Sequence, residues 1–465
     1  MTIRNLLYTA AVFLFIYIVS ITGIGCAQIG APTGGPRDSI PPVLVSAIPK
    51  LLTTNFKGNK ISLIFNEYIN VLEVQKNVIV SPFPKTFPII DFKLKTVNIK
   101  LKDTLLENTT YAINFGNAIA DNNEGNPFKE FTYVFSTGKT IDSLKLGGTV
   151  LMAETGKPDS TLQAMLYRNA NDSSIQQRKP DYIARVSATG KFIFTNLSEG
   201  VYKIYALKDG DGGKTYNSKI ESFAFADADI VVAAVPDSVM LYAYEEEKDI
   251  KKSPIAPVRT AADKRLKYTT SLSTALQQDL LTSLELHFNN KLKNFDTTKI
   301  ILTDTNFNKI EGITFSIDST RKNVSIKNKW PADNYYRLII NKDAVSDSAN
   351  SLLTKTDTIR FKSKKESDYG SLLLRFSKID LAKHPVIQFL NSNEIVKSVP
   401  VTGATWGDKL FTPGEYELRI LYDTNNNGIW DTGNYTKKLQ PEKAITLDKK
   451  ITIKANWENE RDIEL

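Results

Sequence analysis

Cysteine and histidine are nearly missing from this sequence of 465 residues, which contains one cysteine and two histidines. The single cysteine excludes a disulfide within the chain. His287 and His384 have no neighbours at the spacing of a metal site or a catalytic triad. The sequence also lacks the motifs GxSxG and HExxH, the Walker loop and the dinucleotide fingerprint. These absences argue against an enzyme, and we predict a protein without catalytic residues.

Long runs of charge of one sign are missing too. The chain has 59 Lys and Arg residues and 51 Asp and Glu residues, and its formal net charge is +8. The most charged segment, EEEKDIKK, mixes both signs, which is typical of a solvated surface rather than a nucleic-acid footprint. Hydrophobic residues make up 42% of the chain, which is enough for folded domains with cores. We therefore expect a folded protein that binds no nucleic acid.

The N-terminus has the pattern of an export signal. Arg4 precedes the apolar run LLYTAAVFLFIYIV, and small residues follow up to Cys26. The segment SITGIGC resembles the lipobox of bacterial lipoproteins, although Gly23 stands where Leu is usual. The resemblance implies that residues 1–25 are a signal peptide and that Cys26 is lipidated. A buried cysteine in an N-terminal membrane anchor is the alternative.

The residues after this cysteine are rich in Gly and Pro. They predict a flexible tether over residues 26–40, which resembles the start of many Bacteroidetes lipoproteins. Asp does not follow the cysteine directly, and by the same resemblance this favours a lipid anchor in the outer membrane. The anchored chain would face the periplasm or the cell surface.

Short alternating segments follow from residue 41 onward. ISLIFNEYI, FKLKTVNIKL, TYAINF and FTYVFST alternate apolar and polar residues, with turn residues between them. Such segments predict half-buried strands in β-sandwiches. The fold class we predict is all-β.

The chain also repeats itself. Tyr111 aligns with Tyr336, and Asp209 aligns with Asp423. The matching segments are 108–139 with 333–365, and 199–213 with 413–428. The order A, B, A, B predicts a duplicated pair of domains.

Each half of the repeat resembles a known type of sandwich. The segments PPVLVSAIPK, LIFNEYI and FSTGK resemble bacterial Ig-like domains of the S-layer-protein type. LGGTVLMAETGKPDSTLQAMLY and GKFIFTNLSEGVYKIYALKD resemble prealbumin-like or carboxypeptidase-regulatory-like domains. We therefore expect four tandem β-sandwiches, at 41–139 (Ig-like), 140–236 (prealbumin-like), 263–366 (Ig-like) and 367–465 (prealbumin-like). Residues 237–262, with mixed charges and two prolines, are the predicted linker.

The stretch DTNNNGIWDTGNY has the spacing of a calcium loop. In such a loop, oxygens come from positions 1, 3, 5, 7 and 9, and a glycine at position 6 allows the turn. The predicted calcium ligands are Asp423, Asn425, Asn427, the carbonyl of Ile429, and Asp431. Position 12 is Asn434 and not the usual Glu, so any affinity would be weak. A tight turn between two strands is the alternative.

The aligned loop KDGDGGKTYNSK keeps Asp209 and Asp211. It has Gly213 and Lys214 at positions 5 and 6, so it departs from the calcium pattern. No cofactor other than calcium is expected.

Triplets of Asp, Ser or Thr, and a mostly apolar residue recur along the chain. They are similar to the acceptor motif for O-linked glycans on exported Bacteroidetes proteins, although Asp-Ser and Asp-Thr also start turns. The predicted acceptors are Ser39, Thr104, Ser143, Ser238, Ser348 and Thr358.

Together these features predict a non-catalytic, membrane-tethered envelope lipoprotein that acts as a binding or spacer module in adhesion or as a scaffold. Its partners would be the membrane, through the lipid, and an unknown envelope protein or glycan. The alternative is an envelope polysaccharide hydrolase or an accessory subunit of one. Its candidate acids are Glu67, Asp121 and Asp347, which turn chemistry also explains. The candidate sugar-stacking residues are Trp330, Trp406 and Trp430, which core packing also explains.

Overall fold

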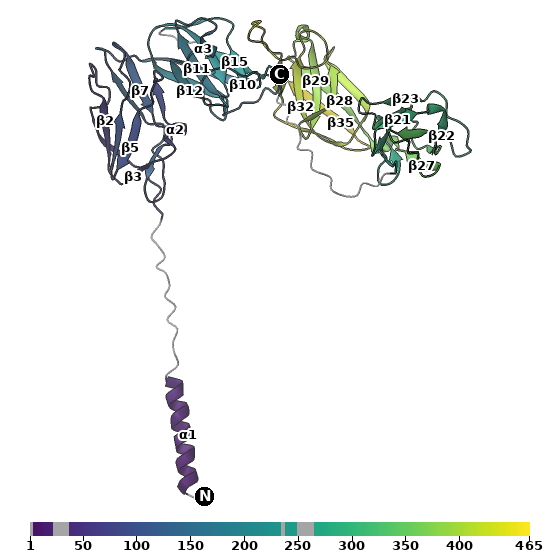
Figure 1. Cartoon of the computed structure of the whole chain (residues 1–465), viewed down its shortest axis with the longest axis horizontal. Coiled ribbons are helices and arrows are strands. Elements are labelled where there is room, and N and C mark those ends of the chain that lie inside the picture. Colours follow the sequence, from purple (N-terminus) through teal and green to yellow (C-terminus); the bar gives the residue numbers. More distant parts are fainter. Residues whose placement is uncertain (1–2, 22–36, 234–237, 249–264) are drawn as a thin grey trace. The chain divides into compact units, whose positions relative to one another are not determined.

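The computed structural model describes residues 3–21, 37–233, 238–248 and 265–465. The chain divides into two compact units, Met1–Ile141 and Asp142–Leu465, and each is described by itself. Strands dominate the described residues (Figure 1). The predicted all-β class is therefore confirmed.

The first unit begins with helix α1 (Ile3–Ile21), the apolar run of the predicted signal. Apolar side chains of this helix, such as Leu7 and Phe13, are exposed. Among the residues that the structure describes, no helix combines the length and hydropathy that a membrane crossing requires. Cys26 lies outside the described residues, as do the flanking positions 22–36.

Residues 38–141 of the first unit fold into sheets around one apolar cluster. One sheet has the order β1 (Leu44–Ile48), β2 (Lys60–Phe65), β6 (Thr96–Lys100), β5 (Ile89–Lys93). A second sheet has the order β4 (Ile79–Ser81), β7 (Thr110–Asn114), β9 (Thr132–Ser136). The third is the pair β3 (Ile69–Val71) and β8 (Ile119–Asp121). The short helix α2 (Val74–Asn77) follows β3. Ile61, Leu63 and Phe65 alternate with more exposed residues, so one face of β2 is buried in the cluster, as period-two patterning requires.

The second unit opens with two sheets built from residues 144–243. The first has the order β13 (Lys191–Leu197), β10 (Leu144–Met152), β17 (Ser238–Ala243). The second has the order β12 (Tyr182–Arg185), β11 (Gln163–Arg168), β14 (Gly200–Leu207), β15 (Phe223–Phe225), with β16 (Ile230–Val232) also paired to β14. The short helix α3 (Ser174–Gln177) follows β11. Apolar side chains from both sheets form one buried cluster.

Strand β17 corrects the predicted linker. Residues 238–243, which we placed in the linker 237–262, pair in parallel with β10 from Gly147 to Met152. Val239, Leu241 and Ala243 are buried, so this segment carries the apolar alternation of a strand. At Gly148, an added Cβ would lie 2.2 Å from the Val239 carbonyl oxygen. The glycine therefore allows the two backbones to approach. The rest of the predicted linker from residue 249 lies outside the described residues.

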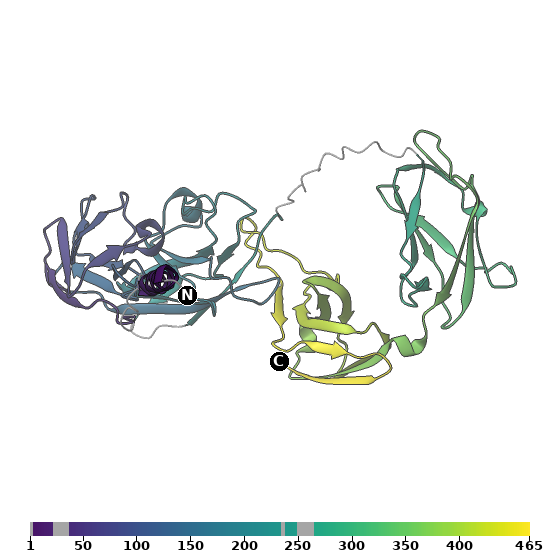
Figure 2. The same ribbon diagram turned by 90° about the horizontal axis from the view of Figure 1, so that it is seen from below.

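Residues 265–366 form three further sheets around a cluster with Trp330, Tyr336 and Phe361. Figure 2 shows these strands in two facing layers. The first sheet has the order β18 (Tyr268–Thr270), β20 (Leu284–Phe288), β24 (Asn323–Lys327), β23 (Thr314–Ile317). The second has the order β19 (Gln277–Gln278), β27 (Asp357–Ser363), β25 (Tyr335–Ile340), β22 (Ile300–Thr303). The third is the pair β21 (Leu292–Phe295) and β26 (Val345–Asp347). Single 3-10 turns occupy Thr297–Lys299 and Glu366–Asp368.

The last part of the chain repeats the sheet order of residues 144–243. One sheet has the order β31 (Thr405–Phe411), β28 (Gly370–Ser377), β35 (Glu458–Glu464), with β28 and β35 parallel. The other has the order β30 (Glu394–Pro400), β29 (Pro385–Asn391), β32 (Gly414–Tyr422), β33 (Lys443–Thr446), with β34 (Ile451–Ile453) on β32. A 3-10 turn lies at Leu381–Lys383. The same connections therefore occur twice, while the number of domains and their boundaries stay predictions.

Candidate functional site

The predicted calcium loop connects β32 to β33. Asp423 begins it and is fully buried, with 0% of its surface exposed. Its Oδ1 accepts the backbone N–H of Asn427 (3.1 Å), and its Oδ2 accepts that of Gly428 (2.6 Å). Gly428 has a φ of 81°, a left-handed conformation that suits glycine. The turn is thus held by the same side chain that would be the first calcium ligand.

The other predicted ligands gather around Asp431. Its Oδ2 accepts the Nδ2 groups of Asn425 (2.5 Å) and Asn427 (2.7 Å). The Oδ1 of Asn427 accepts the N–H of Ile429 (2.8 Å), whose side chain is exposed. The structure therefore brings the predicted residues into one loop, which is closed by its own amides. The calcium loop and the tight turn both stay predictions.

Glu442 also belongs to this loop, and the sequence reasoning missed it. Its Oε1 accepts the N–H and the hydroxyl of Thr424, both at 2.7 Å, and its Oε2 accepts the N–H of Asp431 (3.1 Å). The indole of Trp430 donates to the Glu442 carbonyl oxygen (2.7 Å). Glu442 is buried, and both of its oxygens are satisfied. The calcium-loop template placed the closing residue at Asn434 instead.

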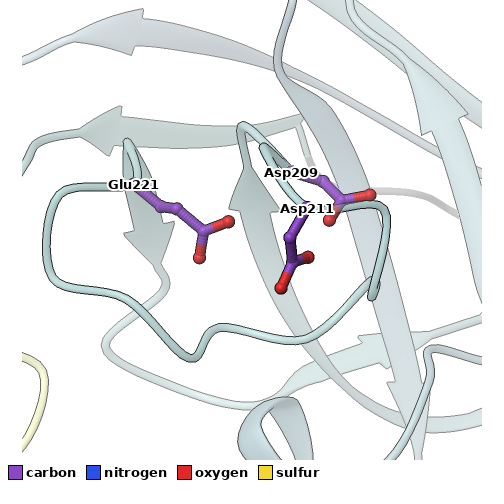
Figure 3. Close-up of side chains that lie close together, drawn as sticks. All are labelled: Asp209, Asp211 and Glu221. Atoms are coloured by element: carbon purple, nitrogen blue, oxygen red, sulfur yellow. The ribbon is translucent and has the colours of Figure 1, made fainter.

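The aligned loop of residues 144–243 connects β14 to β15. Asp209, Asp211 and Glu221 lie close together there (Figure 3), and one carboxylate oxygen from each lies within 4.8 Å of the other two. Asp211 is exposed, whereas Glu221 is buried with 9% of its surface exposed. We expected the two aspartates in this loop, but not the glutamate. Aligning the two loops at their closing strands as well as at Asp209 and Asp423 would have paired Glu221 with Glu442.

Two of these three acids have partners in the loop itself. Lys214 lies with its Nζ 2.5 Å from the Oδ2 of Asp209, and its N–H donates to Oδ1 (3.2 Å). Asp211 accepts the Nδ2 of Asn217 (2.8 Å) and the N–H of Gly213 (2.7 Å). These hydrogen bonds, that of Asn217 first, lower the pKa of the Asp211 carboxyl. The loop therefore holds the Asp211 carboxyl as an anion.

Glu221 is less well satisfied. Its Oε1 accepts the N–H of Gly210 (3.1 Å), which corresponds to the contact between Glu442 and Thr424. Its Oε2 is buried and has no hydrogen-bond partner within the described part of the chain. The cluster thus combines an unsatisfied carboxylate oxygen with two further carboxylates.

The acids of the hydrolase alternative are part of turns. The Oδ1 of Asp121 accepts the N–H groups of three successive residues, and its Oδ2 accepts that of Asn126 (2.7 Å). Burial raises the pKa of this carboxyl, but the four backbone hydrogen bonds outweigh it, and the pKa is lowered. Asp347 likewise accepts the N–H groups of Ala349 and Ser351, and its pKa is lowered by the bond from Ser351 first. Anions held in this way do not suit general acid catalysis.

Glu67 shows the opposite shift. Burial raises the pKa of its carboxyl, and the charge of Asp121 raises it further. A pair with diverging pKa values is what acid and base catalysis requires. Because both oxygens of Asp121 are taken by the backbone, however, the pair resembles a capped turn more than a catalytic dyad.

The three tryptophans have structural contacts. Trp330 is buried against Tyr336 and Phe361, and Trp406 packs on Phe389. Trp430 lines a cavity of about 510 Å³ in the second unit together with Ile429, Ile395, Glu154, Glu246 and Lys248, among others. This last tryptophan therefore lies beside a hollow surface.

The predicted glycan acceptors are all exposed. The solvent-exposed acceptor residues are Ser39, Thr104, Ser143, Ser238, Ser348 and Thr358. Exposure is required for modification but does not demonstrate it, so the glycans stay a prediction.

Comparisons with known proteins support part of the sequence reasoning. Residues 38–137 match the family model of the bacterial Ig-like domain, which confirms that resemblance for the first sandwich. No curated protein matches the chain.

Among solved structures, native alpha-2-macroglobulin from Escherichia coli (domains MG0-NIE-MG1) has 11% identity, covers 42% of this chain and 97% of its own, and has a TM-score of 0.20. BcpA, the major pilin subunit of Bacillus cereus, has 10% identity, coverage of 70% and 99%, and a TM-score of 0.17. The S-layer protein rSbsC(31-844) has 12% identity, coverage of 91% and 54%, and a TM-score of 0.17. Scores this low carry no argument about this chain.

Proposed function

We propose that the protein is a non-catalytic lipoprotein of the cell envelope that acts as an adhesion or scaffold module. Lipid on Cys26 would hold the chain at the outer membrane, and its loops would contact a partner. The β-sandwich architecture and the bacterial Ig-like match at residues 38–137 are consistent with a non-catalytic role. The apolar run of α1, followed by the sole cysteine, supports the tether.

One observation carries the choice between a scaffold and a hydrolase. Two of the three carboxylates considered for a hydrolase, Asp121 and Asp347, accept backbone N–H groups, as in the four bonds to Asp121. A side chain so bound stabilises a turn, because each N–H would otherwise lack a partner. These two acids therefore serve the fold.

A contact surface is available beside Trp430. Its cavity of about 510 Å³ has the size of a small ligand pocket. Ile429 is exposed at its rim, with 62% of its surface accessible. Aromatic and apolar residues with a polar rim favour protein or glycan contacts, so this cavity is the first place to seek the partner.

Crosslinking in whole cells of the native host tests the proposal. We expect one envelope partner to be captured by the unaltered chain and to be lost with Trp430→Ala. Trp457→Ala, at an exposed tryptophan away from the cavity, is the matched control and should retain capture. If the purified chain released sugars from envelope polysaccharide and Asp121→Asn abolished this, the hydrolase alternative would replace the scaffold.

A further inference from the structure

Glu221 has a feature that its loop does not explain. The residue is buried, and its Oε2 has no hydrogen-bond partner among the described residues. A buried carboxylate oxygen without a partner destabilises the fold, since water no longer solvates it. The Glu221 carboxylate belongs to a cluster with Asp209 and Asp211, and Figure 3 shows its side chain extending toward the two aspartates.

The aligned loop provides an internal comparison. Glu442 has the same contact through Oε1, but its Oε2 accepts the N–H of Asp431. The loop from Asp423 to Glu442 is longer, and the extra residues supply this donor. The shorter loop that ends at Glu221 lacks an equivalent donor, so its second oxygen is left for another partner.

The charges of the cluster suggest the nature of that partner. Three carboxylates meet one cation, Lys214, which pairs with Asp209. In the described part of the chain, neither Asp211 nor Glu221 forms an ion pair. The loop therefore has a local excess of two negative charges, which a divalent cation would balance.

The spacing of the oxygens fits such an ion. Calcium binds carboxylate oxygens at about 2.4 Å, so two oxygens on one ion lie at most about 4.8 Å apart. One carboxylate oxygen from each of Asp209, Asp211 and Glu221 lies within 4.8 Å of the other two. Lys214 is partly exposed, and its flexible stem lets the ammonium move into solvent when a cation enters.

We propose that the loop between β14 and β15 binds a divalent cation of the calcium type through Asp209, Asp211 and the free oxygen of Glu221. This site differs from the loop at Asp423, which the sequence favoured, and it does not depend on the proposed function. Competition from Lys214 makes the site weak, with a Kd on the order of 10⁻⁴ to 10⁻³ M, as in extracellular modules.

Calorimetric titration of the chelator-treated, full-length chain with CaCl₂ tests the site. The titration uses a chain with Asp423→Asn and Asp431→Asn, so that the other loop contributes little. We expect one bound ion. Glu221→Gln should weaken binding at least tenfold, and Lys214→Gln should strengthen it several-fold. Glu415→Gln removes an exposed carboxylate elsewhere and should leave the affinity unchanged. Absence of calcium heat up to 10-fold above the expected Kd, or unchanged affinity in Glu221→Gln, overturns the proposal.

Thermal unfolding distinguishes a Glu221 side chain that binds calcium from one that only stabilises the turn. Calcium should raise the melting temperature of the unaltered chain, and Glu221→Gln should lose this rise without melting at a lower temperature in chelator. If Glu221→Gln lowers the melting temperature equally with and without calcium, the glutamate serves only the turn, and the proposal is wrong. If the Asp423→Asn, Asp431→Asn chain does not fold, the same comparison is made between the unaltered chain and Glu221→Gln, where the number of bound ions should fall by one.

Discussion

Replacing Tyr435 with alanine tests how the second unit is held together. Tyr435 lies in the connection between β32 and β33 and is buried, with 4% of its surface exposed. Its ring meets Phe223 at 5.0 Å, Phe225 at 5.3 Å and Tyr205 at 6.0 Å between centroids. These partners belong to β14 and β15, far away in the sequence. One side chain therefore joins the two parts of this unit that share a sheet order.

The magnitude follows from packing and hydrogen bonds. Removing a buried aromatic side chain costs about 3–5 kcal/mol. The hydroxyl of Tyr435 pairs with that of Tyr205 at 3.1 Å and donates to the carbonyl oxygen of Asp172. Each such bond contributes about 0.5–1.5 kcal/mol. Tyr435→Phe should thus cost about 1–2 kcal/mol, and Tyr435→Ala about 3 kcal/mol or more.

Hydrogen exchange measures this loss of stability at individual amides. It is the suitable method because a chain with several sandwiches has no single free energy of unfolding. The N–H of Tyr435 donates to the Oε1 of Glu246 (3.0 Å), and that of Ala444 donates to the carbonyl oxygen of Ala153 (2.8 Å). A loss of about 3 kcal/mol corresponds to roughly a hundredfold faster exchange at these amides. Tyr435→Phe should give about a tenfold increase.

Tyr335→Ala is the control, since Tyr335 is 59% exposed and surface substitutions change stability little. Its exchange at the Tyr435 and Ala444 amides should match that of the unaltered chain. Unchanged exchange in Tyr435→Ala would refute the reasoning, because it would mean that the buried ring does not hold these parts together.

Four further predictions concern the tether, the glycans, the loop at Asp423 and stability in acid. Cys26→Ser should abolish lipid labelling and release the chain from the membrane fraction or leave its precursor uncleaved; persistent labelling would contradict the anchor. Intact mass from the native host should exceed that of the lipidated chain by whole sugar units, and a mass without this excess would exclude the glycans. If the loop at Asp423 binds calcium, millimolar calcium should raise the melting temperature of the last sandwich, and Asp423→Ala with Asp431→Ala should remove the rise; identical curves with calcium and chelator would leave only a turn. The folded-state pKa of Asp121 is lowered from its ordinary value of 3.8, so its stabilisation is present above that pH and is lost as the pH falls through the lowered value; Asp121→Asn should flatten this acid loss in a series of melting curves.

Local patterns in the sequence predicted most of the strands. The alternation of Ile61, Leu63 and Phe65 is visible in the letters and gives β2 its buried face. Hydrophobic alternation is a property of neighbouring residues, so the sequence displays it directly. The repeated segments likewise pointed to Asp209 and Asp423, and the structure places both at the end of equivalent strands.

Long-range pairing was less visible. Residues 238–243 form β17 because β10 offers them a parallel edge, although nearby charges and prolines suggested a linker. Glu221 and Glu442 were missed for a related reason: each closes its loop from the far side, so a fixed spacing from the first aspartate does not locate it. A template of positions counted from one end cannot anticipate a loop of different length.

The loops that end at Glu221 and Glu442 show how added residues can supply a hydrogen-bond donor to a buried carboxylate. In the longer loop, the residues after Gly428 give Glu442 a donor in the N–H of Asp431 and place Tyr435 in its aromatic contacts. Both oxygens of the first aspartate there accept backbone N–H groups, whereas Asp209 of the shorter loop forms an ion pair with the ammonium of Lys214. The longer loop is therefore satisfied by its own backbone and is used for packing. The shorter loop leaves one buried carboxylate oxygen of Glu221 without a donor among the described residues, and this is the physical reason to look for a cation there first.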